Sequence, residues 1–138
     1  MRKVDCYPTL SWFTIDQLEN LSHSSGFTRT QYTARIAHLS LWNQSCLEVL
    51  QPYIILPATF HWKAPGEIFG VFPSKTPKRI STPEGRRIKF RISFEDYQRL
   101  KMIQYATFTS SRDSLWSLLI PSVLQNQRVR ALIGSDFQ

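Results

Sequence analysis

Residues 86–93 alternate between cationic and apolar side chains, and this alternation most constrains how the chain can fold. The cations Arg87, Lys89 and Arg91 are interleaved with three apolar residues, Ile88, Phe90 and Ile92. A period of two is typical of a β-strand that buries one face and exposes the other. The segment therefore predicts a short strand whose outer face is basic.

Two capped helices are expected directly after this strand. Ser93 is followed three residues later by Asp96, and at this spacing a hydroxyl and a carboxylate can satisfy backbone donors at a helix start. The same spacing recurs from Ser110, ahead of a second apolar stripe. The segment 86–124 thus predicts strand, helix, turn and helix, although Pro121 should kink or end the second helix.

A unit of this size needs a second copy to become stable. One short strand cannot form a sheet, and two short helices close only a thin core. Antiparallel pairing of one strand from each copy would give a two-stranded ribbon with a basic outer face. Such a ribbon fits the major groove of B-form DNA.

In this order of elements the segment 86–124 resembles the ribbon-helix-helix DNA-binding proteins of bacteria, archaea, their plasmids and viruses, the Arc and MetJ type. The resemblance implies an α+β, mostly helical fold with a short two-stranded antiparallel ribbon. It also implies that Arg87, Lys89 and Arg91 contact bases. The start of the second helix would contact phosphate, and its residues are Ser110, Ser111 and Arg112.

Residues 1–50 carry a weaker version of the same pattern. We expect a strand over residues 7–13, a helix capped by Thr14 that ends at Gly26, and a further helix capped by Thr28. Aligning Thr14 with Ser93 requires a shift of 79 positions (93 − 14), and aligning Thr28 with Ser110 requires 82 (110 − 28). This alignment turns three residues outward that cannot read base edges as Arg or Lys can: Pro8, Leu10 and Trp12.

Two interpretations of residues 1–50 follow. The segment is a degenerate second copy, in which case one chain holds both halves of a tandem ribbon-helix-helix protein. Alternatively it is a plain helical region whose caps match by chance. The first predicts a monomer with a complete ribbon, and the second predicts a homodimer or a higher oligomer.

Residues 51–85 form a proline-rich and aromatic-rich insertion between the two segments. Prolines recur too often for a helix to persist, so short strands are expected at 53–56, 59–62 and 68–72, with a turn at Pro65-Gly66. The aromatic residues are too many for a disordered linker, and they are Phe60, Trp62, Phe69 and Phe72. We expect an ordered hairpin or an irregular packed insertion, which could contact a protein partner.

The charge of the chain favours a polyanionic partner. Its formal net charge is +7, from 17 Lys and Arg against 10 Asp and Glu. The cations gather between residues 75 and 91, as expected for phosphate binding. Beside the strand cations, this cluster adds further candidate phosphate contacts: Lys75, Lys78, Arg79 and Arg86.

No catalytic or metal-binding motif stands out, and we expect neither an enzyme nor a cofactor. The three histidines lack the spacing of a helical zinc site, and the chain has no phosphate-binding glycine loop. Cys6 and Cys46 have no metal-like spacing. With no secretory leader recognisable at the N-terminus and no apolar run long enough to span a membrane, we expect a cytoplasmic protein, and the family resemblance implies a prokaryotic cell, plasmid or virus as its source.

Together these features predict a sequence-specific double-stranded DNA-binding protein, a transcriptional repressor or a plasmid or viral regulator. The unit at 86–138 would bind DNA with its basic ribbon. Two alternatives remain: a protein-interaction module, such as an antitoxin or a subunit of a nucleoprotein complex, and a binder of RNA or single-stranded nucleic acid.

Overall fold

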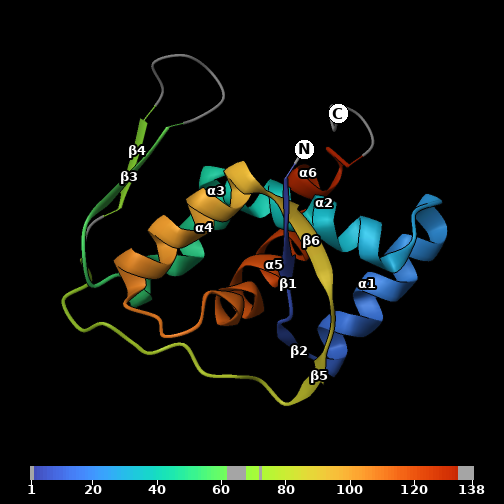
Figure 1. Cartoon of the computed structure of the whole chain (residues 1–138), viewed down its shortest axis with the longest axis horizontal. Coiled ribbons are helices and arrows are strands. Elements are labelled where there is room, and N and C mark those ends of the chain that lie inside the picture. The colour runs from blue at the N-terminus through green and yellow to red at the C-terminus, as the bar shows by residue number, and fades with distance from the viewer. Residues whose placement is uncertain (1, 62–67, 72, 134–138) are drawn as a thin grey trace.

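The computed structural model describes residues 2–61, 68–71 and 73–133 (Figure 1). The strands are β1 (Lys3–Cys6), β2 (Thr9–Ser11), β3 (Ala58–His61), β4 (Ile68–Val71), β5 (Gly85–Arg87) and β6 (Phe90–Ser93). The α-helices are α1 (Trp12–Ser25), α2 (Arg29–Leu41), α3 (Gln44–Leu47), α4 (Phe94–Thr107), α5 (Trp116–Leu124) and α6 (Gln127–Arg130), and the 3₁₀-helices are η1 (Glu48–Tyr53) and η2 (Arg112–Leu115). The predicted α+β, mostly helical class is confirmed.

Residues 3–11 and residues 85–93 meet in an antiparallel ribbon. β1 pairs with β6, and β2 pairs with β5. Both ladders keep one register, since Cys6 faces Phe90 and Thr9 faces Arg87. Tyr7 therefore lies opposite Lys89 at the centre of the paired segments. We call residues 3–11 and 85–93 together the ribbon, and each of the two segments one strand of it.

The two halves of the chain repeat one backbone pattern about this centre. Ser11 caps α1 four residues after Tyr7, and Ser93 caps α4 four residues after Lys89. Both helices have 14 residues, and each ends at a left-handed residue, Gly26 in one case and Phe108 in the other. A single shift of 82 positions relates all these pairs (93 − 11 and 108 − 26).

The predicted register of the first strand is wrong. The helix begins at Trp12 and is capped by Ser11, whose Oγ accepts from the Thr14 amide at 3.2 Å. Thr14 is thus the third helical residue, three positions after the true cap. An odd shift turns every strand residue to the opposite face, which is why Pro8 and Leu10 are buried and not turned outward.

The remaining helix starts follow the predictions in part. Thr28 and Gln31 form the expected capping box at the start of α2. The second helix of the C-terminal half starts one residue later than predicted, with Ser111 in the cap position and no capping bond from its side chain. α5 continues for three residues past Pro121 and ends at Leu124.

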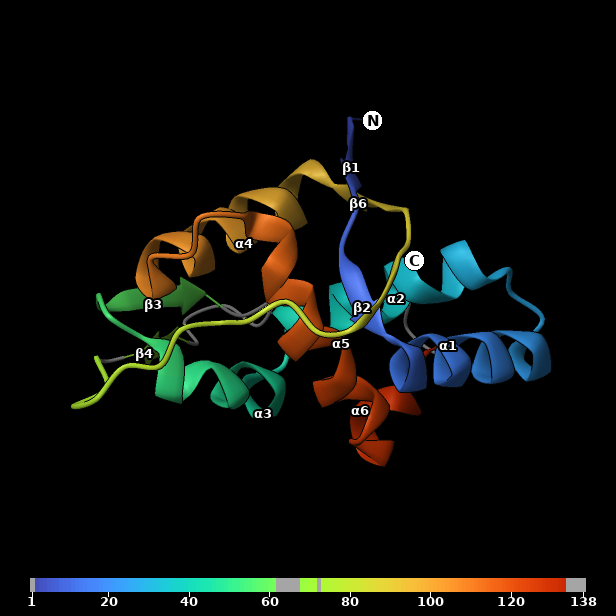
Figure 2. The same cartoon turned by 90° about the horizontal axis from the view of Figure 1, so that it is seen from below.

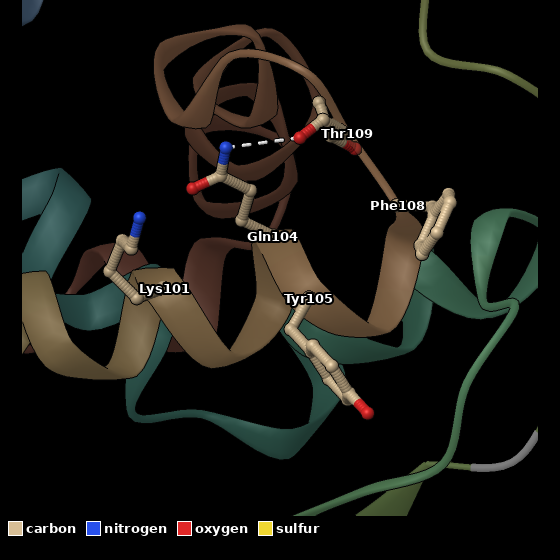
Figure 3. Close-up of a pocket in the computed structure, with 5 residues that line it drawn as sticks. All are labelled: Lys101, Gln104, Tyr105, Phe108 and Thr109. Carbon is tan, nitrogen blue, oxygen red and sulfur yellow. Dashed lines mark hydrogen bonds between the residues drawn. The ribbon is translucent and has the colours of Figure 1, made fainter.

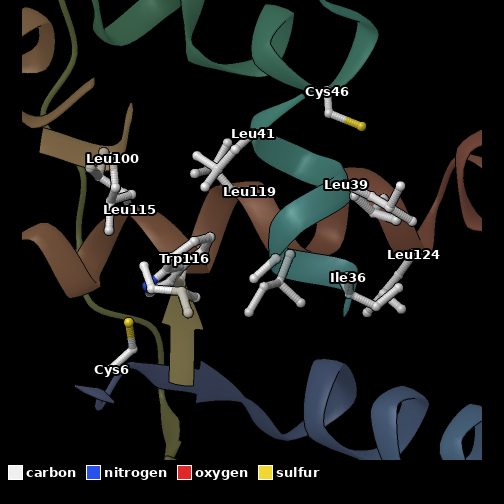
Figure 4. Packing of buried hydrophobic residues seen from close by; sticks show 14 of the residues in the cluster. Cys6, Ile36, Leu39, Leu41, Cys46, Leu100, Leu115, Trp116, Leu119 and Leu124 are labelled. Carbon is white, nitrogen blue, oxygen red and sulfur yellow. The ribbon is translucent and has the colours of Figure 1, made fainter. Parts of the chain in front are cut away.

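The inner face of the ribbon packs on α2 and α5 (Figure 4). Trp116 of α5 is fully buried, and its ring packs against that of Phe90 in a T-shaped arrangement with centroids 5.3 Å apart. Ile36 and Leu41 of α2 and Leu100 of α4 belong to the same buried cluster. Because the cluster draws on both halves of the chain, the two strand-helix-helix segments share one core.

The insertion forms the expected hairpin, since β3 and β4 pair antiparallel. Its predicted turn at Pro65-Gly66 lies outside the described residues, as do Trp62 and Phe72. The strand expected at 53–56 does not form, because the amides of Ile55 and Leu56 both donate to the carbonyl of Ala106 at the end of α4. From residue 73 the chain runs along the lower edge of the molecule to β5 (Figure 1).

A buried polar clasp joins the two halves behind the ribbon. Asp96 of α4 is only 4% exposed and accepts a hydrogen bond from Trp42 Nε1 at 2.7 Å, while its other oxygen lies 2.8 Å from His38 Nδ1. Arg99 lies 4.2 Å above the Trp42 ring and donates to the carbonyl of Leu41. Burial lowers the pKa of the Arg99 guanidinium to about 10.

We predict that Asp96→Ala destabilises the fold by about 2–4 kcal/mol, because it leaves buried donors without their acceptor. Urea unfolding would measure the change in the free energy of unfolding. Glu95→Ala, a neighbouring acid that is exposed, is the matched control and should change stability by about 0.5 kcal/mol or less. Equal effects of the two substitutions would contradict a structural role for the clasp.

A second prediction concerns the end of α4. Phe108 holds φ 56° and ψ 33°, a left-handed conformation that costs a bulky residue energy and suits glycine, and its side chain is 73% exposed. Phe108→Gly should therefore stabilise the protein by about 0.5–1 kcal/mol, and the reciprocal change Gly26→Ala should destabilise it. Thermal unfolding of both variants tests this, and a lower midpoint for Phe108→Gly would refute it.

Candidate nucleic-acid interface

The outer face of the ribbon carries the side chains that the sequence singled out. Ile88, Phe90 and Ile92 are buried, and the interleaved cations are exposed as predicted: Arg87, Lys89 and Arg91. The first strand adds Asp5, Tyr7 and Thr9 to the same face, since Cys6, Pro8 and Leu10 point inward. We call these six outward residues, three from each strand, the outer face.

Each cation of the outer face has a partner on the neighbouring strand. Arg91 Nε lies 3.1 Å from Asp5 Oδ1. Arg87 Nε donates to the Tyr7 carbonyl at 3.2 Å, and its guanidinium carbon lies 5.7 Å from the centre of the Tyr7 ring. Lys89 Nζ lies at the same distance from that ring. Each exposed cation thus also contacts the facing strand.

The free backbone edge of β1 is held by η2. The Tyr7 amide donates to Asp113 Oδ2 at 3.0 Å, and Arg112 Nη2 donates to the carbonyl of Asp5 at 2.9 Å. The Arg112 guanidinium also stacks on the Tyr97 ring, 5.1 Å from its centre. These contacts fix the orientation of the strand that displays Asp5 and Tyr7.

The residues predicted to contact phosphate lie in three places. Arg86 is exposed in β5, next to the outer face. Ser110 and Ser111 are exposed in the turn before η2, but Arg112 is occupied with β1 as described. Three further cations are exposed on the segment that leads to β5, away from the paired strands: Lys75, Lys78 and Arg79.

Sequence reasoning missed Asp5, Tyr7 and Thr9. A usable signal existed, because apolar Val4, Cys6, Pro8 and Leu10 alternate with polar residues along this stretch. Choosing Thr14 instead of Ser11 as the helix cap hid this alternation.

A second exposed surface lies at the end of α4, where a hollow of about 420 Å³ is open to solvent (Figure 3). Its lining residues are Lys101, Gln104, Tyr105, Phe108 and Thr109. Tyr105 is 64% exposed, and Gln104 is held by a hydrogen bond from its Nε2 to the Thr109 carbonyl at 3.0 Å. The hollow thus offers aromatic surface on a fixed backbone.

We also searched the described part of the chain for metal sites, membrane-spanning helices and disulfides. There, no group of three or more His, Cys, Asp and Glu side chains could hold a metal ion. Among the same residues, no helix combines the length and the apolar character needed to cross a bilayer. Cys6 and Cys46 are both buried free thiols.

Comparison with known proteins identifies no relative of this chain. No protein-family model, curated protein or solved structure matches this chain. Its geometry alone therefore has to support a functional assignment.

The thiol of Cys6 beneath the outer face yields a third prediction. Burial, reinforced by the Asp113 carboxylate, raises its pKa from 9.0 to about 12. The thiolate is the reactive form, so iodoacetamide at pH 9 should modify Cys6 in the unfolded chain and leave it untouched in the folded one. Mass spectrometry of peptides with and without urea measures this, and rapid labelling of the folded protein would contradict it.

The same shift has a defined sign for stability. Because the pKa of Cys6 is raised in the folded protein, the protonated thiol makes its full contribution to the free energy of unfolding below pH 9. That contribution falls as the pH rises toward 12. Cys6→Ala is the control, since it removes this part of the pH dependence.

Proposed function

We propose that this protein is a single-chain, tandem ribbon-helix-helix protein that binds double-stranded DNA through the outer face of its ribbon. The observation that carries the proposal is the display of Arg87, Lys89 and Arg91 on one exposed face of a ribbon whose other face is buried. A two-stranded ribbon is one of the elements that the major groove admits.

The repeated backbone pattern supports the tandem arrangement. In a ribbon-helix-helix dimer each chain supplies one strand, and here residues 3–11 and 85–93 of one chain supply both. The equal lengths of α1 and α4 and the single shift of 82 positions are expected if the halves correspond to the two subunits of such a dimer.

In the proposed complex the ribbon enters the groove and the strand cations donate to acceptors on base edges. Guanine O6 and N7 are the preferred partners of Arg and Lys. Arg86 and the exposed cations at 75–79 would contact or attract phosphate, which supplies affinity without sequence preference. The role proposed for the protein in its host is transcriptional regulation.

The hollow at the end of α4 favours a second candidate function, an interaction with another protein. Tyr105 and Phe108 are exposed, although large apolar side chains are usually covered. This function does not exclude the first, because α4 leads away from one end of the ribbon (Figure 2).

Our fourth prediction tests the outer face. Replacing Lys89 or Arg91 by alanine should weaken binding to the cognate duplex by about 1–3 kcal/mol with little loss of folding, because each side chain is exposed. Arg128→Ala in α6 removes an exposed cation that is not on the ribbon and is the matched control. The cognate duplex comes from selection in a random library, and gel-shift titration gives the affinities.

Two further readouts decide between the alternatives. Sedimentation should show a monomer that binds duplex DNA, because one chain holds both strands. Stronger competition by RNA than by duplex DNA at matched salt would favour an RNA-binding protein, and unchanged affinity in both ribbon variants would remove the ribbon from the mechanism.

A further inference from the structure

The two strands of the ribbon present different chemistry at equivalent positions of the outer face. The shift of 82 positions pairs Asp5 with Arg87, Tyr7 with Lys89, and Thr9 with Arg91. A homodimer would carry the same side chain at both members of each pair. Here one strand carries three cations, and the other carries an acid, an aromatic ring and a hydroxyl.

Cross-strand pairing arranges these residues into two unlike ends. At one end Asp5 faces Arg91, and Asp5 Oδ1 lies 3.1 Å from Arg91 Nε. At the other end Thr9 faces Arg87. The charge of Arg91 is therefore balanced by an acid on the facing strand, while Arg87 faces the uncharged Thr9.

The acid is displayed on the same face as the cations. The Asp5 side chain is 42% exposed and that of Arg91 is 61% exposed, so both can reach a ligand that covers the face. Arg112 donates to the Asp5 carbonyl and Asp113 accepts from the Tyr7 amide, so the backbone at Asp5 and just after it is held, which limits where the carboxylate can move. A carboxylate facing DNA is repelled by phosphates unless a base edge donates to it.

From this asymmetry we infer that the outer face recognises a duplex sequence without twofold symmetry, and that Asp5 is a specificity-determining residue. The inference rests on the proposed DNA-binding function. Asp5 accepts a hydrogen bond from a cytosine amino group and holds Arg91 so that it donates to a neighbouring guanine, because these are the base edges that suit a carboxylate and a guanidinium. Arg87 reads a purine acceptor at the other end, and Lys89 reads one at the centre.

Asp5 also lowers affinity for the wrong sequence. On a site that offers no donor, its charge opposes the phosphates and Arg91 stays paired with it. Removing the charge would release Arg91 for phosphate contact on any duplex. Affinity for non-cognate duplexes would then rise while specificity falls. Loss of a simple attractive contact would instead lower affinity.

Selection of bound fragments from a random duplex library by the full chain tests the first part. We expect a consensus whose two halves are not inverted repeats of each other. A palindromic consensus would overturn the inference while leaving the proposed function intact.

The second part is our fifth prediction, and it compares Asp5→Asn with wild type on the selected duplex and on a scrambled duplex. The ratio of the affinity for the selected duplex to that for the scrambled duplex should fall by about 5- to 150-fold. This is the discrimination that one base contact provides. The slope of log affinity against log salt on the scrambled duplex should steepen by about one phosphate contact. Asp16→Asn, which removes an exposed acid from α1, is the control and should change neither quantity.

The outcomes separate the two levels of the proposal. If wild type binds duplex DNA and Lys89→Ala weakens it, but Asp5→Asn leaves the affinity ratio unchanged, only the role of Asp5 is refuted. If wild type binds no duplex at low salt, the proposed function fails and this inference falls with it. Circular dichroism of Asp5→Asn would verify that the variant is folded.

Discussion

Backbone pairing between residues 3–11 and 85–93 is the interaction on which the rest of the structure depends. It brings together segments from opposite parts of the chain, and it sets the directions in which α1 and α4 leave the ribbon. Its inner face supplies Phe90 to the ring of Trp116, so the strands and the helices complete one core. Contacts this distant in sequence carry a loop-closure cost, which α2, α5 and the clasp around Asp96 offset by burial.

The two halves share a backbone plan and differ in how they complete it. Gly26 ends α1 without strain, whereas Phe108 adopts the left-handed conformation at the equivalent position. Thr28 caps α2 with a full capping box, but the Ser111 side chain makes no capping hydrogen bond to η2. In the C-terminal half, Arg112 and Asp113 instead turn toward β1 and support it. The last of these departures supports the strand that carries Asp5 and Tyr7.

Local chemistry made the C-terminal half predictable from the sequence. The alternation of Ile88, Phe90 and Ile92 with cations is a strand signal that burial confirms, and the cap at Ser93 lies where the hydroxyl spacing placed it. The N-terminal strand was misread because Ser11 and Thr14 are both good caps, and only pairing with β5 and β6 decides between them. The clasp of His38, Trp42 and Asp96 could not be foreseen, because its partners are distant in sequence and meet only through tertiary packing.

Covalent linkage of both strands changes how the ribbon responds to dilution. A ribbon built from two subunits exists only above their dissociation constant, and mixing with a related subunit can produce hybrids. In this chain the partner strand is always present at the same effective concentration, so formation of the ribbon requires no encounter between chains. The linkage also frees each strand to vary alone, because a substitution appears once in the ribbon instead of twice.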